Sequence, residues 1–129
     1  MEIIIKTEKR EQIIDITEKV KEALKKSLER GKAALIYVPH ATCSIIINEN
    51  CDKNVCEDIL AALRQQFPKG VWQHDNIDSN GDAHIKATII GSSKLIPLEN
   101  NELMLGNWQS IALAEFDGPR ERKVIVKII

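Results

Sequence analysis

The sequence has few aromatic residues, few cysteines and no long apolar run. Its 129 residues include two Trp, two Phe, one Tyr and three Cys. No stretch approaches the roughly 20 apolar residues that a membrane-spanning helix needs, and the charged start lacks the apolar segment of a secretory signal. The cysteines are odd in number and form no Cys-x-x-Cys pair, which favours a reducing, cytoplasmic setting. We therefore expect no membrane partner and no disulfide framework.

Neither sign of charge predominates. Eighteen Lys and Arg face nineteen Asp and Glu, which gives a net charge of -1 at pH 7. A protein that binds nucleic acid or a membrane surface needs a basic excess to meet the phosphates, so the composition argues against both partner classes. The expected partner is a small molecule.

Isoleucine is abundant where aromatic residues are scarce. The chain contains twenty Ile against two Phe, so β-branched side chains should dominate the core, and these suit pleated sheets better than helices. A length of 129 residues is typical of one domain, and the sequence has no repeat, low-complexity tract or flexible linker. We expect a single domain over residues 1–129.

Hydrophobic periodicity predicts two helices among about eight short strands. The helices are expected from Asp15 or Thr17 to a stop at Gly31, and over residues 52–66, where Asn50 or Asp52 would cap the second. Strands are predicted at residues 2–7, 10–16, 33–38, 42–47, 83–90, 94–98, 102–105, 108–116 and 123–129. Tight turns join most of them, which favours a mostly antiparallel, sandwich-like α+β domain over a doubly wound parallel sheet.

The three histidines are candidates for a metal centre. His40 follows the strand predicted over residues 33–38, His74 follows the short segment Val71-Trp72-Gln73, and His84 opens the strand predicted over residues 83–90. Neutral imidazole is a common ligand of zinc and similar ions, and three imidazoles would leave one coordination position open. Their spacing matches no compact zinc finger, so the fold would have to assemble a shared site. The alternative is three ordinary surface or half-buried histidines.

A loop with three carboxylates and no basic residue lies between two of these histidines. Residues 75–82 contain Asp75, Asp78 and Asp82. Carboxylates here could bind an ion directly, or could accept hydrogen bonds that orient the imidazoles. The alternative is a solvated acidic turn.

Further polar residues at predicted strand ends and turns could bind a substrate. Glu49, which follows Asn48, is a candidate ligand or general base, unless this segment only leads into the second helix. Ser92, in a Gly-Ser-Ser turn, and Arg120, in an Asp-Gly-Pro-Arg turn, could bind a phosphate through hydroxyl, backbone and guanidinium donors. Both segments could equally be plain turns.

Lys86, Trp108 and Gln109 complete the candidates. In the strand predicted over residues 83–90, Lys86 lies on the side opposite Ile85 and could reach the same opening as His84. Trp108 could stack on a flat ring with the Gln109 amide beside it, although filling the core is a commoner role for a lone Trp. The cysteines fit core packing better than chemistry.

Taken in chain order, six segments carry a resemblance to a known family: Pro39-His40 with Ser44, Ile47-Asn48-Glu49-Asn50, Asn80 with Asp82-Ala83-His84-Ile85-Lys86, Gly91-Ser92-Ser93, Leu105-Gly106-Asn107-Trp108-Gln109, and Glu115-Phe116-Asp117-Gly118-Pro119-Arg120. Together they resemble the YjbQ family, described as secondary thiamine-phosphate synthase enzymes. The resemblance covers nearly the whole chain. Two positions depart from the family pattern: Asn101 stands where Gly is usual, and Asn107 where Thr is usual.

The resemblance implies a β-rich α+β fold that assembles as a homotrimer. It also implies one pocket that contains His40, His74 and His84, with Asn48, Glu49 and Asp82 nearby. The implied reaction joins hydroxymethylpyrimidine pyrophosphate to thiazole phosphate and releases pyrophosphate.

That reaction needs a divalent ion and cationic donors for the leaving group. Lys86, Arg120 and Arg122 could be the donors, and Glu49 or Asp82 could hold the ion. Magnesium would suit a pyrophosphate substrate, whereas three imidazoles select zinc, manganese or iron. We therefore expect a zinc or transition-metal centre, with thiamine-phosphate formation as a side activity of it.

Two other functions stay open at this point. A metal-dependent hydrolase of a small phosphorylated or acylated metabolite would use the three histidines as ligands and Glu49 or Asp82 as general base. A non-catalytic trimer would hold a metal or small anion without turnover. The sequence leaves open whether the site lies within one subunit or between two.

Overall fold

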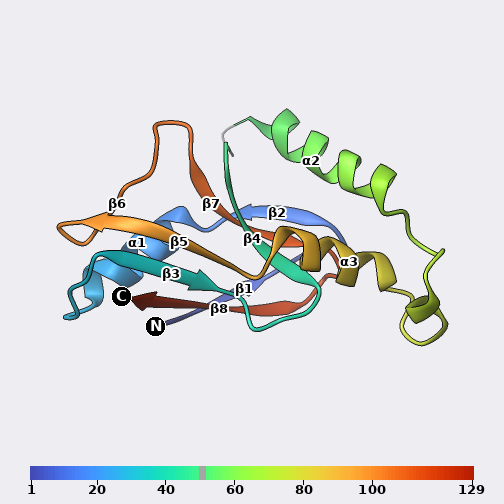
Figure 1. Cartoon of the computed structure of the whole chain (residues 1–129), viewed down its shortest axis with the longest axis horizontal. Coiled ribbons are helices and arrows are strands. Elements are labelled where there is room, and N and C mark those ends of the chain that lie inside the picture. The colour runs from blue at the N-terminus through green and yellow to red at the C-terminus, as the bar shows by residue number, and fades with distance from the viewer. Residues whose placement is uncertain (50–51) are drawn as a thin grey trace.

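The chain forms two antiparallel sheets, in a computed structural model that describes residues 1–49 and 52–129 (Figure 1). The strands are β1 (Glu2–Lys6), β2 (Gln12–Asp15), β3 (Ala33–Tyr37), β4 (Cys43–Asn48), β5 (Ser93–Glu99), β6 (Glu102–Leu103), β7 (Ser110–Glu115) and β8 (Glu121–Ile128). One sheet has the order β1-β8-β3-β5-β6, and the other has the order β2-β7-β4. The expected α+β architecture with about eight antiparallel strands is confirmed.

The main core lies between the two sheets and is built mostly from β-branched residues. In β8, alternate side chains point inward, among them Val124 and Val126, which are fully buried. Ile36 of β3 and Ile45 of β4 meet them from the two sheets. This is the core that the abundance of isoleucine predicts.

Strand β7 is covered on both faces. Its residues Ile111 and Leu113 belong to the main core, whereas Ala114 packs into a second, smaller cluster with Leu60, Ala83, Ala87 and Phe116. Because side chains alternate along a strand, β7 can face the two clusters at once. Because β7 is packed on both faces, the position of its last residue, the buried Glu115, is well fixed.

Two helices lie where the periodicity predicts them. They are α1 (Thr17–Lys26) and α2 (Lys53–Gln66). Asp52 caps α2 by accepting a hydrogen bond from the amide of Asn54 at 2.8 Å, while the alternative cap, Asn50, lies outside the described residues, as does Cys51. The prediction that Gly31 stops α1 is wrong, because the helix ends five residues earlier. A Cβ at Gly31 would instead run into Ile128 and Ile129, so glycine is needed there for a close approach.

The segment predicted as a strand over residues 83–90 is a helix, α3 (Gly81–Ile90). Its alternating Ile and Ala residues favour a strand, but Ala83 and Ala87 are also four residues apart, and both pack into the second core cluster. The segment before it contains a short 3-10 helix, η1 (Gln73–Asn76). The carboxylate of Asp75 joins the two by accepting hydrogen bonds from the amides of Trp72 at 3.0 Å and Gly81 at 2.8 Å.

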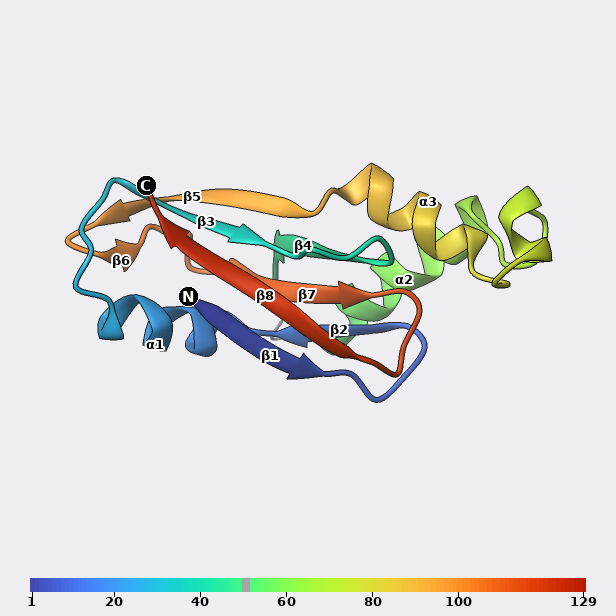
Figure 2. The ribbon, with the colours of Figure 1, turned by 90° about the horizontal axis from the view of Figure 1, so that it is seen from below.

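The helices occupy opposite ends of the molecule (Figures 1 and 2). α1 and β6 lie at one end, and α3 with η1 lies at the other. At the α3 end the chain passes from β7 to β8 through a turn with a cis peptide bond between Gly118 and Pro119. Among the described residues, no helix is long and apolar enough to cross a membrane.

Candidate functional site

His74 and His84 are in direct contact. The first lies in η1 and the second on α3, and their ring centroids are 4.6 Å apart with the rings nearly perpendicular. Nε2 of His74 is enclosed, lies 3.5 Å from a carboxylate oxygen of Asp78, and has no hydrogen-bond partner in the described part of the chain. The acidic segment between the two histidines thus brings them together and supplies a carboxylate beside one of them.

Asp82 and Lys86 lie on the other face of α3. In a helix, residues four apart share a face, so Lys86 lies above Asp82 and points away from His84. Nζ of Lys86 donates to Oδ2 of Asp82 at 2.9 Å, and both side chains are buried. The prediction that Lys86 shares an opening with His84 rested on strand alternation and is wrong.

Arg10 completes this buried group from the loop between β1 and β2. Its guanidinium donates to both carboxylate oxygens of Asp82, at 2.9 Å and 3.2 Å. Glu11, the next residue in the chain, also belongs to this group. Its Oε2 is buried and lies 3.7 Å from Nζ of Lys86 and 3.8 Å from Nη1 of Arg64. Burial by itself would raise the pKa of Asp82, but the hydrogen bonds and charges of Arg10 and Lys86 prevail and lower that pKa. Asp82 is therefore held as a carboxylate between two cations.

Arg120 is tied to the same region through Asp117. Its Nε donates to the Asp117 carbonyl at 2.7 Å, and its guanidinium donates to the Asp117 carboxylate at 2.8 Å. That carboxylate also accepts a hydrogen bond of 2.8 Å from Nδ2 of Asn80, the residue before α3. The turn between β7 and β8 is thereby fixed against the start of α3. Just over half of the Arg120 side chain is exposed, and its charge remains accessible.

A second buried ion pair closes the core at this end. Glu115 of β7 and Arg122 of β8 meet at 2.6 Å between carboxylate and guanidinium. Arg122 also donates to the hydroxyl of Thr42 at 2.7 Å, and the hydroxyl of Thr7 donates to Glu115 at 2.9 Å. Glu115 and Arg122 come from different sheets, while Thr7 and Thr42 lie next to the ends of β1 and β4. Arg122, a predicted phosphate donor, is buried and engaged within this network. The network therefore joins the sheets where the chain crosses between them.

His40 lies beside this network rather than beside the other two histidines. Its Nε2 accepts a hydrogen bond of 2.9 Å from the backbone amide of Lys123. Partial burial and the nearby charge of Arg122 lower its pKa, so the imidazole is neutral at pH 7. Because Nε2 accepts this bond, the neutral ring carries its proton on Nδ1. The carbonyl of Ser92 accepts a hydrogen bond from Val38, which places Ser92 next to the strand that leads to His40.

Four candidate residues lie at the far end of the smaller sheet. Asn48 pairs with Ser110 at the opposite end of the β4–β7 ladder from the Cys43–Glu115 pair. The two ends are five residue steps apart along β4, which is about 17 Å at the usual rise of a strand. Glu49 follows Asn48, while Trp108 and Gln109 precede β7. Trp108 is 71% exposed on the segment that rises above the sheets in Figure 1.

The three histidines do not form a ready three-ligand metal site. No group of three His, Cys, Asp or Glu side chains suited to a metal ion exists within residues 1–49 and 52–129. His40 also engages its Nε2 lone pair with Lys123. His74 and His84 fit an ion only as an adjacent pair, which would need further ligands from water, a substrate or another protein chain.

The polar partners Arg10, Glu11 and Asp117 are absent from the sequence-based candidates. Arg10 and Asp82 are 72 positions apart, and Asn80 and Asp117 are 37 apart, so local patterns cannot reveal these contacts. One local signal does exist. The spacing of Asp82 and Lys86 is that of a helical ion pair.

The fold and these clusters define a small two-sheet α+β protein with a polar, histidine-containing end. A family profile described as "UPF0047 protein YjbQ-like" matches residues 1–129, and the chain belongs to this YjbQ/UPF0047 family. A UPF0047 protein of Archaeoglobus fulgidus is 45% identical over 130 residues, 100% of both chains. The UPF0047 protein YugU of Bacillus subtilis is 41% identical over 128 residues, 97% of this chain and 95% of YugU.

Solved structures of relatives share this fold. The crystal structure of an uncharacterised YjbQ/UPF0047 protein from Clostridium acetobutylicum gives a TM-score of 0.93 at 48% identity and covers 100% of this chain and 99% of its own. A hypothetical protein from Aeropyrum pernix K1 gives a TM-score of 0.94 at 39% identity, with coverage of 100% and 96%. Neither description names an activity, so the function has to be argued from the site.

Proposed function

We propose that this chain is an enzyme acting on small phosphorylated metabolites, and that its activity includes condensation of hydroxymethylpyrimidine pyrophosphate with thiazole phosphate. The observation that carries the proposal is the contact of His74 with His84 at the two ends of an acidic segment, with Arg10, Lys86 and Arg120 near the same helix. Two adjacent imidazoles, with Nε2 of His74 enclosed and without a hydrogen-bond partner in the described structure, are suited to bind a metal ion or to accept a proton from a substrate. The choice of this reaction comes from the resemblance of the sequence motifs to the YjbQ family.

The cations near α3 divide into two roles in this proposal. Arg120 is exposed enough to contact a pyrophosphate and stabilise the charge that develops on it as it leaves. Arg10 and Lys86 are engaged by Asp82 and act instead as supports that hold α3 in place. Asp82 is then a positioning residue, because a carboxylate enclosed by two cations is a poor general base.

A divalent ion is part of the proposal, held by His74 and His84. Zinc, manganese or iron suits imidazole ligands, and magnesium would suit a pyrophosphate-bound ion. When bound, such an ion would neutralise charge on the pyrophosphate. His40 stands apart from this pair and can donate its Nδ1 proton in a hydrogen bond to a substrate oxygen.

We further propose that the active protein is a homotrimer with a site shared between subunits. The support is the separation of the candidates into two groups, one around α3 and one with Asn48, Glu49, Trp108 and Gln109. The second group lies at the Asn48–Ser110 end of the β4–β7 ladder, about 17 Å along the strand from the Cys43–Glu115 end, and a neighbouring copy could bring the exposed Trp108 to the α3 end.

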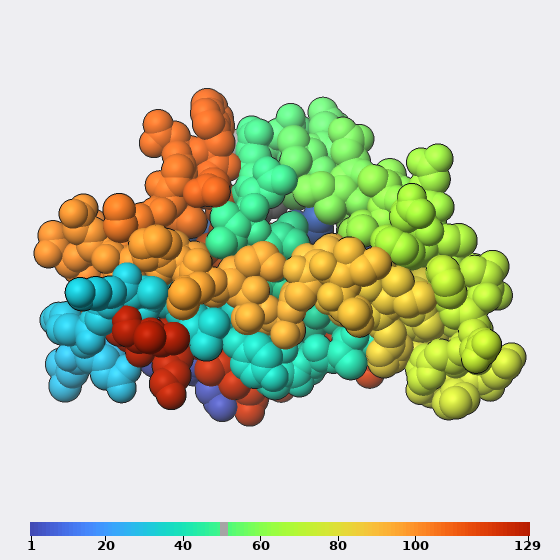
Figure 3. Space-filling view, viewed as in Figure 1, coloured from blue at the N-terminus to red at the C-terminus, as the bar shows by residue number. Residues whose placement is uncertain are grey.

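The apolar face of α2 also supports assembly. Val55, Ile59 and Leu63 of this helix are only half-buried, and Leu60 alone of its described residues is buried. A groove lined by Ile46, Ile47, Ile59, Leu63 and Ile90 runs between α2, β4 and α3. Figure 3 shows α2 and the segment before β7 as neighbouring lobes above the body. A trimer would cover this face, and sedimentation should then report three chains of 14.5 kDa.

Rescue of a thiamine auxotroph that lacks its own synthase tests the proposed activity. The wild-type chain and Gln73→Ala, an exposed neighbour of His74, should restore growth, whereas His84→Ala should not. Rescue by His84→Ala would remove this histidine from the mechanism. Purified protein that hydrolyses the pyrophosphate substrate without the thiazole acceptor would favour a hydrolase, and tight ion retention without turnover would favour a binding protein.

Mixing two inactive variants tests the shared site. His84→Ala and Trp108→Ala change different groups of candidates, so mixed trimers would contain some sites free of both changes. Activity should return when the two are unfolded and refolded together. No recovery, in trimers shown to contain both variants, would place the whole site within one subunit.

A further inference from the structure

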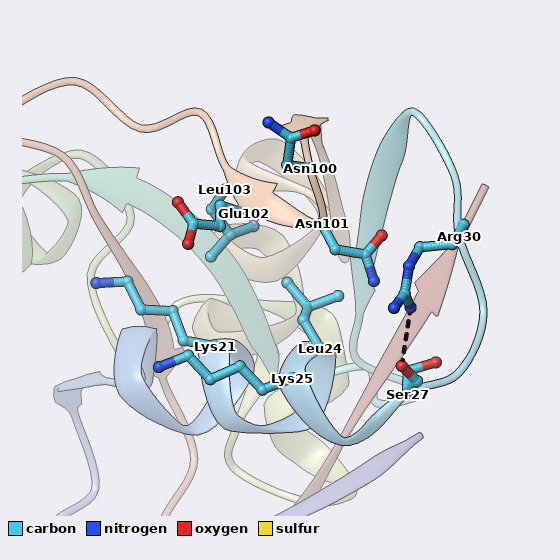
Figure 4. A pocket seen from close by; sticks show the side chains of 9 residues that line it. All are labelled: Lys21, Leu24, Lys25, Ser27, Arg30, Asn100, Asn101, Glu102 and Leu103. Atoms are coloured by element: carbon cyan, nitrogen blue, oxygen red, sulfur yellow. Dashed lines mark hydrogen bonds between the residues drawn. The ribbon is translucent and has the colours of Figure 1, made fainter.

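A polar cavity lies at the end of the molecule away from His74 and His84. It occupies about 470 Å³ between α1 and the turn that joins β5 to β6, a volume in the range of small-molecule sites. Figure 4 shows α1 along one side of the cavity and residues 100–103 along the other. Figures 1 and 2 place α1 and β6 far from η1 and α3, so this cavity is separate from the candidate site.

Three cations line the cavity against one carboxylate, that of Glu102. Lys21 and Lys25 are one turn apart on the same face of α1. Arg30, in the loop after α1, donates to the carbonyls of Ser27 at 3.2 Å and Glu29 at 2.9 Å. Backbone carbonyls hold the guanidinium in place without neutralising its charge, which leaves it able to attract an anion.

The ion pair between Lys21 and Glu18 does not remove this excess of positive charge. Their charged atoms are 2.9 Å apart, but the Glu18 side chain is 79% exposed and that of Lys21 is 44% exposed. An exposed pair of this kind contributes little, so Lys21 can turn to a bound anion at small cost. The lining thus favours a phosphate or another compact anion.

Asn101, which also lines the cavity, has a side-chain oxygen without a hydrogen-bond donor in the described structure. Its Oδ1 is enclosed and finds no hydrogen-bond donor in the described structure, while its Nδ2 donates to the carbonyl of Glu29 at 3.0 Å. That bond ties the β5–β6 turn to the loop after α1 and fixes the amide. An enclosed acceptor without a donor is unfavourable, so a ligand hydroxyl at this position would be stabilising.

We propose that this cavity binds a phosphorylated polyol or sugar. Lys21, Lys25 and Arg30 supply the charge that holds the phosphate, and a ligand hydroxyl donates to Oδ1 of Asn101. Leu24 and Leu103, which also line the cavity, give the carbon skeleton an apolar surface. This mixture of one charged group, hydroxyls and a short carbon chain matches the lining better than an inorganic anion alone.

Titration of the isotope-labelled full chain, followed by amide NMR at about 150 mM salt, tests the proposal. Glycerol 3-phosphate should bind more tightly than inorganic phosphate and should shift the amides of residues 100–103. Lys25→Ala should weaken glycerol 3-phosphate about tenfold, the effect of losing one charge-assisted contact. Lys26→Ala removes the same charge from the neighbouring position, which does not line this cavity, and should leave the affinity unchanged.

A variant of Asn101 tests the hydroxyl contact. Asn101 has a φ of 64°, so Asn101→Gly keeps a backbone conformation that glycine adopts freely. It should lower the affinity for glycerol 3-phosphate to that for inorganic phosphate, with the latter unchanged. The proposal would be overturned if Lys25→Ala and Lys26→Ala lost the same affinity for glycerol 3-phosphate. It would also be overturned if the amide shifts were confined to residues 73–86, or if glycerol 3-phosphate did not bind.

Discussion

Lys86 donates a hydrogen bond to Asp82 across one turn of α3, with 2.9 Å between Nζ and Oδ2, and the two side chains are 1% and 0% exposed. Two buried opposite charges are tolerated only when both are present, because either charge alone would be buried without a partner to compensate its lost hydration. The pair also decides the geometry of the candidate site. It fixes one face of α3 against Arg10, so the opposite face carries His84 toward His74.

Lys86→Met should lower the free energy of unfolding by about 3–5 kcal/mol, because it leaves Asp82 and Glu11 with a reduced set of cations in a buried setting. Urea denaturation followed by circular dichroism measures this. Lys21→Met is the matched control, since Lys21 also pairs with a carboxylate on its own helix but is exposed, and its change should be within about 1 kcal/mol. If both substitutions changed the free energy of unfolding by the same small amount, the Lys86–Asp82 pair would not be buried as described.

His40 should make the fold less stable as the pH falls below about 6.5, the usual pKa of a histidine. Its pKa in the folded chain is lowered, first by burial and then by Arg122, so the unfolded chain takes up a proton that the folded chain resists. In His40→Gln the free energy of unfolding should therefore fall less steeply over this range. NMR titration of the imidazole checks the cause directly, and a folded-state pKa of 6.5 or above would refute it.

Gly118→Ala should destabilise the turn between β7 and β8. A Cβ at this position would collide with the carbonyl oxygen of Lys9 and lie 2.7 Å from Oγ1 of Thr7, in the network that joins the two sheets. We expect a loss of about 1–3 kcal/mol in the free energy of unfolding, toward the upper end because a backbone atom has to move. Gly106→Ala, with its nearest neighbour at 3.4 Å, should change stability by less than about 0.5 kcal/mol. Thermal melts of the two variants give the comparison.

Cys43 should resist thiol reagents until the chain unfolds. Burial raises the pKa of its thiol to about 12, so at pH 8 only about one molecule in ten thousand carries the reactive thiolate. Cys56 is only partly buried and should react before Cys43. Labelling with an aromatic disulfide, followed by peptide mass spectrometry, distinguishes the two. Rapid labelling of Cys43 in folded protein would show that β4 is open to solvent.

The sheets were predictable because their signal is local. Short runs of β-branched residues mark β1, β4 and β8, namely Ile3–Ile5, Ile45–Ile47 and Val124–Val126, and Asp52 marks the start of α2. The sequence predicts a strand over residues 83–90 because Ile85, Ala87 and Ile89 alternate with other residues, whereas the segment is part of α3. Its helical state depends on contacts of Asp82 and Lys86 with distant residues, together with burial of Ala83 and Ala87 against β7.

The candidate site was only partly predictable for a related reason. His74 and His84 flank one short acidic segment, so their contact follows from local chain geometry. His40 is held by a backbone amide of β8, 83 positions further along the chain, which no spacing rule reveals. The charged run around Arg10 looks like a solvated turn until its partner Asp82 is known.

Formation of thiamine phosphate by the purified protein tests the central claim most directly. The assay supplies hydroxymethylpyrimidine pyrophosphate and thiazole phosphate, with zinc, manganese, iron(II) or magnesium added in turn, and detects the product by mass spectrometry. The wild-type chain and Gln73→Ala should form product at the same rate, whereas His74→Ala and His84→Ala should be about 100-fold slower while keeping the wild-type melting temperature. Equal rates in all four proteins, or no product under any of these conditions, would contradict the proposed function.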